Sequence, residues 1–289
     1  MTTPGGHPEV LGPDTPLARV LAFCETSGHA DPAGAWQELT RAWNWAAPLT
    51  TAVPRVDFPG PVARPVPGGF ALSGQWRLSS PDGTGPWLVL PLAPARSGDP
   101  DLFVAPSRVL PGAVRVLTGE AGPDFRLEDV YVPAGFVTHT AGTPLRAGDA
   151  VFLWTAVTGL ALGAARRMTD ALAAPTGPEL AAVLHDERLI LAAVLHGGPS
   201  ARQGLPEDVE RRLAARVGQA GSAVHQVVAV AYEHVLAADD SGVGHPLTSL
   251  IEAASPILQQ VRYVMELLPR DDRTSPRKAE PGDDRRISG

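Results

Sequence analysis

The sequence predicts an α+β protein in which an antiparallel β-sandwich or barrel is followed by a C-terminal helical bundle of the four-helix type. The first observation is a change of hydrophobic period, from two residues over 68–133 to the helical period after Asp149. The second is the uneven placing of the 30 prolines and 30 glycines, which crowd into segments such as 1–16 and 48–67. The third is a composition of 44% hydrophobic and 19% charged residues, which excludes bulk disorder.

The 289 residues divide into four predicted parts. These are a short N-terminal arm with helices (1–47), a β-domain (48–148), a helical bundle (149–269) and a tail (270–289). The tail has no apolar period and nearly balanced charge, so we predict that it is disordered.

Two short helices are predicted near the N-terminus. Apolar residues recur at helical spacing over 17–24 and again over 36–43. Asp31 and Pro32 stand where an N-cap and a first helical residue are expected for the second helix. The prolines of 48–67 then exclude a helix, because a helix interior does not accept proline.

Several short strands are predicted in the β-domain. Phe70, Leu72, Trp76 and Leu78 share one face of an extended chain with polar residues between them, and a turn signal follows at 81–85. Further strands are predicted at 87–92, 102–105, 113–117 and 125–132.

The helical bundle begins with an uncharged run at 150–165, for which Asp149 is a predicted N-cap. The run is shorter than the roughly 20 apolar residues that a membrane span needs. We therefore predict a buried core helix, in which Gly159 and Gly163 permit a close approach of another backbone. Further helices are predicted at 178–196, 206–237, 246–253 and 255–268, the last capped by Ser255 with Pro256 as its first residue.

Composition and absent motifs exclude several functions. The net charge of -7 argues against nucleic acid or an anionic membrane as the main partner. A single cysteine, Cys24, forbids an intrachain disulfide, and the eight histidines lack metal-ligand spacing, so no metal is expected. No phosphate loop, dinucleotide fingerprint or nucleophile elbow is present. The N-terminus carries no leader pattern, and we expect a cytoplasmic protein.

Three longer motifs follow one another along the chain. They are GGFALSGQWRLSS at 68–80 with WLVL at 87–90, FRLEDVYVP at 125–133, and TGLALGAA at 158–165. In this order they resemble the acyl-CoA dehydrogenase superfamily, including the related flavin-dependent monooxygenases. The first two motifs are similar to that family's middle β-domain and the third to the start of its C-terminal bundle.

The resemblance implies a flavin cofactor, FAD or FMN, against the β-domain. It places Trp76 and Leu78 beside the isoalloxazine ring, although both positions are equally explained as the core face of a strand. Such a protein orients the substrate, tunes the ring through hydrogen bonds and controls water. The remaining cofactor contacts that the resemblance implies are Ser79, Ser80, Thr118 and Gly119.

The chain also departs from the family pattern. Only residues 17–46 can replace an N-terminal helical domain that is much longer in the family, so we infer a truncated domain. In the last helix Arg262 is kept, whereas the monooxygenase aspartate and histidine are not. We predict Arg262 and Glu252 as the polar groups nearest the substrate, with an exposed helix position as the alternative for Glu252.

Two functions follow. The first is a flavin-dependent oxidoreductase, a dehydrogenase or monooxygenase, acting on a hydrophobic intermediate of bacterial specialised metabolism. The alternative is a flavin-free relative that catalyses a non-redox step such as cyclisation or dehydration, or serves as a binding partner. For either, we expect a small hydrophobic or acyl ligand, no nucleic-acid or membrane partner, and a homodimer or homotetramer.

Overall fold

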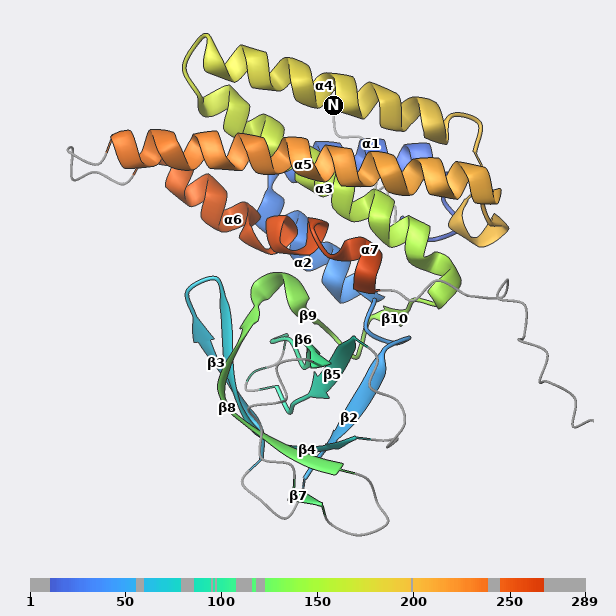
Figure 1. Ribbon diagram of the computed structural model, residues 1–289, viewed down its shortest axis with the longest axis vertical. Helices are drawn as coiled ribbons and strands as arrows, with labels where there is room; N and C mark the ends of the chain where they lie inside the picture. Colours follow the sequence, from blue (N-terminus) through green and yellow to red (C-terminus); the bar gives the residue numbers. More distant parts are fainter. Residues whose placement is uncertain are drawn as a thin grey trace, which may run out of the picture.

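The computed structural model combines a layer of helices with a curled β-sheet beneath it (Figure 1). This arrangement confirms the predicted α+β class. The structure describes residues 11–55, 60–78, 86–94, 96, 98–107, 116–117, 123–198, 200–238 and 245–267.

The helical layer contains both the N-terminal and the C-terminal helices. Helix α1 packs along α3, and α2 packs against α6, so the first two helices share the core of the bundle (Figure 1). The helices are α1 (Leu17–Ala30), α2 (Pro32–Ala42), α3 (Ala150–Ala171), α4 (Thr176–Leu195), α5 (Glu207–Ala237), α6 (Pro246–Val261) and α7 (Val264–Leu267).

Helix α3 is the central helix of this layer. Its segment from Ala147 to Ala171 is long and apolar enough to cross a membrane, but 89% of the most apolar window is buried inside the protein. The prediction of a buried core helix is therefore confirmed. The helix runs six residues beyond the predicted end because Arg166 and Arg167 point toward α1 and leave the buried face apolar.

The sheet has eight strands and a strong curl, with the order β7-β8-β4-β2-β5-β6-β9 and with β3 beside β4. Its strands are β2 (Thr50–Pro54), β3 (Val62–Val66), β4 (Gly69–Leu78), β5 (Trp87–Pro91), β6 (Leu102–Pro106), β7 (Val116–Leu117), β8 (Pro123–Pro133) and β9 (Val137–Thr138). Two further short strands, β1 (Trp43–Asn44) and β10 (Thr143–Pro144), pair separately.

Most strand pairs are antiparallel, as predicted, but two pairs are parallel and the prediction is wrong for them. Strand β2 lies between β4 and β5, antiparallel to the first and parallel to the second, and β1 and β10 are also parallel. The segment 48–67 also holds two unpredicted strands. Its prolines are tolerated because Pro54 is the last residue of β2 and Pro65 lies on β3, which pairs only with β4.

The predicted break at Ser255 and Pro256 is also wrong, since α6 continues through both residues. A proline removes one helical hydrogen bond, but here the apolar face that includes Ile257 and Val261 stays buried on both sides of the break point. Helix α6 begins at Pro246, and the preceding residue, His245, is its N-cap. The His245 ring Nδ1 accepts a hydrogen bond from the Leu247 N–H at 3.2 Å.

Two of the sequence motifs lie side by side in the sheet. Strands β4 and β8 are antiparallel neighbours, and Trp76 is directly opposite Phe125.

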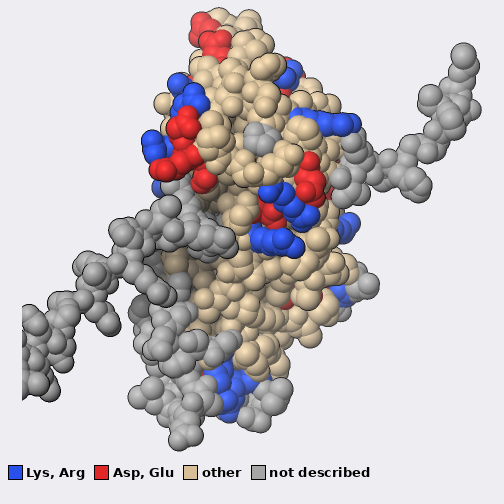
Figure 2. Space-filling model, turned by 90° about the vertical axis from the view of Figure 1, so that its right-hand side faces the viewer, with Lys and Arg blue, Asp and Glu red and all other residues tan. Residues whose placement is uncertain are grey.

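On the face shown in Figure 2, acidic and basic side chains are interspersed over the helical half of the molecule. One continuous hydrophobic core runs from the sheet into the bundle.

Candidate functional site

The sheet and the bundle meet at the 3₁₀ turn Ala134–Phe136, which packs on α6, and we call this contact the seam. The side chain of Gln259 joins the two layers, because it accepts from the Gly135 N–H at 2.9 Å and donates to the Gly68 carbonyl at 3.1 Å. The Tyr131 hydroxyl donates to the same Gly68 carbonyl at 2.9 Å. A side chain at Gly135 would place its Cβ 2.3 Å from the Pro256 carbonyl, so the seam requires glycine there.

Three aromatic side chains fill the seam beside this hydrogen-bond network. Trp87 stacks on Phe136 with ring centroids 5.3 Å apart, and Tyr263 meets both rings edge-on at 5.8 and 5.5 Å. Offset and edge-on ring pairs are favourable beyond the apolar area that they bury. This aromatic cluster holds the end of α6 against β5.

Arg262, a predicted substrate-side group, lies at the edge of the aromatic cluster. Its side chain is exposed, and the guanidinium carbon is 5.6 Å from the Tyr263 ring centroid. A cation over an aromatic ring is attracted by the ring quadrupole, and a cation also suits the C-terminus of α6. The geometry thus presents a positive charge at the outer edge of the seam.

The second predicted substrate-side group, Glu252, does not meet Arg262. Both side chains are exposed on the same helix, but ten residues at a rise of 1.5 Å separate them by about 15 Å. The structure therefore forms no catalytic pair from these two residues.

The two predicted flavin neighbours on β4 are core residues. Trp76 is fully buried, its indole Nε1–H donates to the Pro91 carbonyl at 3.2 Å, and its ring stacks on Phe125. Leu78 is buried as well. Neither side chain presents a surface to a flavin ring, so these two residues do not fit the predicted cofactor contact. The other predicted contacts, Ser79, Ser80, Thr118 and Gly119, lie outside the described residues.

One polar group at the seam has no partner in the described part of the chain. The Gln260 side chain is fully buried, and neither its amide nitrogen nor its amide oxygen has a hydrogen-bond partner. Leaving a buried donor or acceptor unpaired costs about 1–3 kcal/mol. Both amide atoms are closed off from solvent, so a ligand could reach them only if the seam opened.

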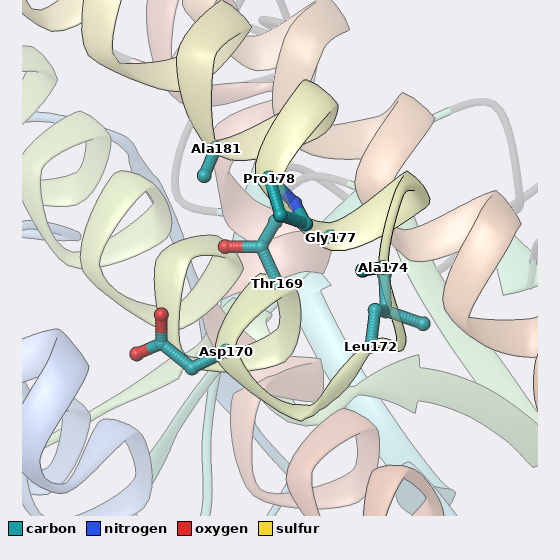
Figure 3. A pocket seen from close by; sticks show the side chains of 7 residues that line it. All are labelled: Thr169, Asp170, Leu172, Ala174, Gly177, Pro178 and Ala181. Atoms are coloured by element: carbon teal, nitrogen blue, oxygen red, sulfur yellow. The ribbon is translucent and has the colours of Figure 1, made fainter.

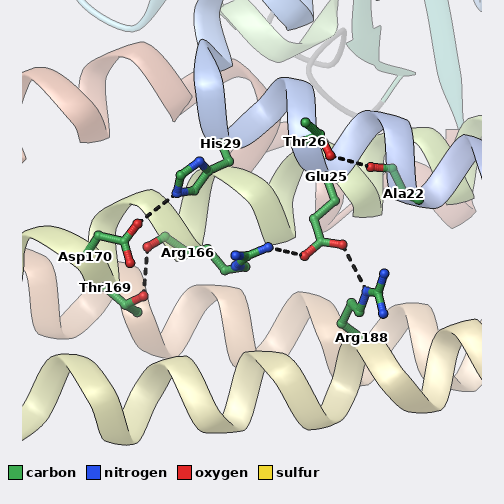
Figure 4. Close-up of polar contacts among 8 residues, drawn as sticks. All are labelled: Ala22, Glu25, Thr26, His29, Arg166, Thr169, Asp170 and Arg188. Carbon is green, nitrogen blue, oxygen red and sulfur yellow. Dashed lines mark hydrogen bonds and ion pairs between the residues drawn. The ribbon is translucent and has the colours of Figure 1, made fainter.

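A cluster of charged side chains that the sequence did not predict lies in the helical bundle (Figure 4). The Glu25 carboxylate of α1 is paired with Arg166 of α3 at 2.7 Å and with Arg188 of α4 at 3.1 Å. One turn later, His29 lies 2.8 Å from Asp170. The Arg166-Arg167 pair after the apolar run was the only sign of this cluster in the sequence. Glu25 is more than 140 residues away from Arg166 and Arg188 along the chain, so no local pattern joins them. The cluster ties three helices together.

A shallow pocket adjoins this cluster between the end of α3 and the start of α4 (Figure 3). Asp170 is its one charged lining residue, and that carboxylate already pairs with His29. The pocket therefore offers little chemistry. It is lined by Thr169, Asp170, Leu172, Ala174, Gly177, Pro178 and Ala181. Across the residues that the structure describes, no three His, Cys, Asp or Glu side chains could jointly hold a metal ion.

Comparison with known proteins gives matches among solved structures alone. No protein-family model matches the chain, and no curated protein matches it. The 3-HSA hydroxylase from Rhodococcus sp. RHA1 is similar at 15% identity and a TM-score of 0.39, over 88% of this chain and 80% of that chain. XiaF from Streptomyces sp., solved with FADH2 and glycerol, is similar at 17% identity and a TM-score of 0.38, over 88% and 81%. The nitrososynthase from Micromonospora carbonacea var. africana is similar at 18% identity and a TM-score of 0.37, over 87% and 80%.

Proposed function

We propose that the protein is a flavin-dependent oxidoreductase that resembles the acyl-CoA dehydrogenases and their monooxygenase relatives. Its substrate would be a small hydrophobic or acyl intermediate of bacterial specialised metabolism. The observation that carries this proposal is the order of three family-like motifs, at 68–90, 125–133 and 158–165.

The fold supports the proposal because it assembles the three motifs into one frame. The first and second motifs form the neighbouring strands β4 and β8, and the third lies in α3, the central helix of the bundle. When bound, a flavin would supply the redox chemistry, while the chain would orient the substrate and control water. Arg262 would attract an anionic part of the substrate at the seam.

The second candidate is a flavin-free relative that catalyses a non-redox step or binds a partner. One observation favours it: Trp76 and Leu78, the two described residues predicted to border the flavin, are packed into the sheet core.

The visible spectrum of the purified protein separates the two candidates. A flavin oxidoreductase should still show a flavin absorption band after desalting, with an intensity that corresponds to about one flavin per chain. Otherwise its melting temperature should rise when FAD or FMN is added. A colourless protein with no thermal shift would overturn the first candidate and favour the second.

A pair of variants tests the predicted flavin contacts. Ser79→Ala combined with Ser80→Ala should weaken flavin binding by about 1–3 kcal/mol if these hydroxyls hydrogen-bond the ring. Ser222→Ala, on the exposed face of α5, is the matched control and should leave binding unchanged. Equal flavin affinity in the two variants would show that the Ser79 and Ser80 hydroxyls do not bind the flavin.

We further propose that the chain forms a homodimer or homotetramer in the cytoplasm, without a nucleic-acid or membrane partner. Light scattering of the purified protein should give a mass of at least twice the 30.2 kDa of one chain. A mass equal to one chain would contradict the assembly.

A further inference from the structure

Helix α5 presents a long face to solvent. With 31 residues it is the longest of the described helices, and it crosses the whole helical layer (Figure 1). One side of α5, which includes Leu213, Val217 and Val224, is buried in the bundle. The opposite side carries a line of residues that are exposed, except for the half-buried Gly218, and we call this line the α5 stripe. It consists of Arg211, Ala215, Gly218, Ser222, His225, Ala229, Tyr232 and Leu236.

The spacing of the α5 stripe is typical of a helix that packs along another helix. Its residues alternate at intervals of four and three, which keeps them on one line along the helix surface. Its large apolar residues lie near the C-terminal end of α5, where Tyr232 is 51% and Leu236 is 71% exposed. Apolar side chains left open at helix-packing intervals indicate a surface that another helix covers.

A line of polar side chains runs beside the stripe and indicates which partner fits. Its four residues are all exposed and repeat every seven positions: Arg212, Gln219, Gln226 and Glu233. Seven residues are close to two helical turns, so these side chains flank the stripe along its length. The line begins with a cation and ends with an anion. It therefore complements a copy of itself that runs in the opposite direction.

The stripe is also complementary to itself in this antiparallel arrangement. A twofold axis that passes between residues 223 and 224 brings the large C-terminal half of one stripe against the small N-terminal half of the other. Large and small side chains that face each other fill the space between two helices without forcing them apart. The facing pairs are Tyr232 with Ala215, Ala229 with Gly218, and His225 with Ser222.

The charged ends of the flanking line select the direction of the pair. In the antiparallel arrangement, Arg212 of one copy and Glu233 of the other lie within about 3 Å of each other along the helix axis, within reach of two long side chains. In a parallel pair each residue would face its own copy. Arginine would then face arginine and glutamate would face glutamate, and like charges across an interface are unfavourable.

We propose that the α5 stripe is the docking surface for a second copy of this chain, whose own α5 packs along it in the antiparallel direction. Both copies use the same surface, as a twofold dimer requires. The proposal gives a defined interface to the assembly proposed above and rests on that assembly, not on the flavin.

Disulfide cross-linking tests the register of the pair. The nearest neighbour of a Cβ at Gly218 would be Met265 at 3.9 Å, so the helix accepts a side chain there. Gly218→Cys protein mixed with Ala229→Cys protein and then oxidised should give a cross-linked dimer on a non-reducing gel. Either variant alone should give none, because each residue would lie about 16 Å along the axis from its own copy.

Wild-type protein is the control for cross-linking, since its one thiol, Cys24, is buried. The absence of a cross-linked dimer in the mixture would overturn the proposal. Equal cross-linking in the mixture and in the single variants would overturn it as well, because the register would then be wrong.

Charge reversal tests the direction. Glu233→Arg and Arg212→Glu should each raise the dissociation constant of the dimer at least about tenfold, since each brings like charges together. Both changes in one chain should restore the wild-type constant, because the pairs then re-form with the signs exchanged. Glu38→Arg, exposed on α2, makes the same change of charge away from α5 and should leave the constant unchanged. Analytical ultracentrifugation measures all four variants.

The outcomes distinguish this proposal from the flavin proposal. Dimers that bind as tightly after either charge reversal as in wild type would overturn the role of α5, whether or not the protein is coloured. A monomeric wild-type protein would also overturn it and would leave the stripe to another segment or another protein. A colourless protein that dimerises with the expected cross-link and charge response would keep the α5 pairing while the flavin proposal fails.

Discussion

Glu25 is a buried carboxylate whose charge is balanced by arginines from two other helices. Its side chain is 7% exposed, whereas Arg166 is 49% and Arg188 34% exposed. The two arginines keep part of their hydration, so the cluster avoids most of the cost of burying a complete ion pair. Its effect is to fix α1 against α3 and α4 at one point.

Glu25→Gln should therefore lower the free energy of unfolding by about 1–3 kcal/mol, because both arginines lose a charged partner in a partly buried site. Chemical denaturation followed by circular dichroism measures the change. Glu207→Gln breaks the exposed pair with Arg211 on α5 and should cost no more than about 0.5 kcal/mol. Equal losses in the two variants would show that Glu25 acts as an ordinary surface residue.

Cys24 is the one thiol of the chain and is packed against α3. Burial raises its pKa from 9.0 to about 12. Above pH 9 the unfolded thiol ionises while the folded thiol does not, so stability should fall with rising pH by up to about 1.4 kcal/mol per pH unit. The fall should be absent from Cys24→Ala.

Thiol reagents give a simpler measurement for Cys24. In native protein at pH 8 the thiol should react slowly with an aromatic disulfide reagent, and in urea it should react at the rate of a free cysteine. A fast native reaction would mean that the thiol is accessible.

At the scale of elements, the crossing of α1 and α3 depends on glycine. The position of a Cβ at Gly163 would be 2.1 Å from the Glu25 carbonyl, and at Gly159 it would be 2.8 Å from the Leu21 carbonyl. On the opposite helix, Gly28 similarly faces the Leu160 carbonyl at 2.4 Å. The predicted role of the α3 glycines in close backbone approach is confirmed.

Gly163→Ala should force α1 away from α3, since the added carbon meets backbone rather than a flexible side chain. We expect a loss of at least about 2 kcal/mol in the free energy of unfolding, in the upper range for overpacked cores. Gly148→Ala, where no neighbour lies within 4 Å of the added carbon, is the control and should be nearly neutral. Equal stability of the two variants would contradict the close crossing.

At the scale of the whole molecule, the sheet and the bundle share one hydrophobic core and one hydrogen-bonded seam. A protein with a continuous core unfolds in one cooperative step more readily than one with separate cores. We therefore expect the transitions followed by far-UV circular dichroism and by tryptophan fluorescence to coincide.

Gln259→Leu tests the seam, because it removes the partner of the Gly135 N–H and a donor to the Gly68 carbonyl. The variant should lose about 1–3 kcal/mol while both probes still report one transition. Gln219→Leu, at an exposed position of α5, is the matched control. Two separate transitions in wild-type protein would show that the layers unfold independently.

Much of the fold could be predicted from local patterns. Hydrophobic period and the positions of glycine and proline predicted the helix at α3, the strand at β4 and the change from sheet to helices. The same patterns were wrong at Pro256, where α6 continues, and they did not reveal the two strands within 48–67. Whether a proline ends an element depends on the packing of the residues around it, and that packing is absent from a local pattern.

The candidate site was less predictable. Trp76 and Arg262 were recognised by their motifs, but a motif does not say whether a side chain faces the core or a ligand. The pairing of Glu25 with Arg166 and Arg188 joins residues that are 141 and 163 positions apart. Such pairs have no common spacing that a sequence pattern could reveal.

The sequence by itself determined the types of the elements and the need for a close helix crossing, because helical and strand periods and glycine content are local properties. The tertiary structure alone decided that β2 lies parallel to β5, that Trp76 is a core residue and that Glu25 meets arginines of two other helices. These outcomes depend on which distant surfaces meet, and apolar burial favours any complementary surface without regard to its distance along the chain.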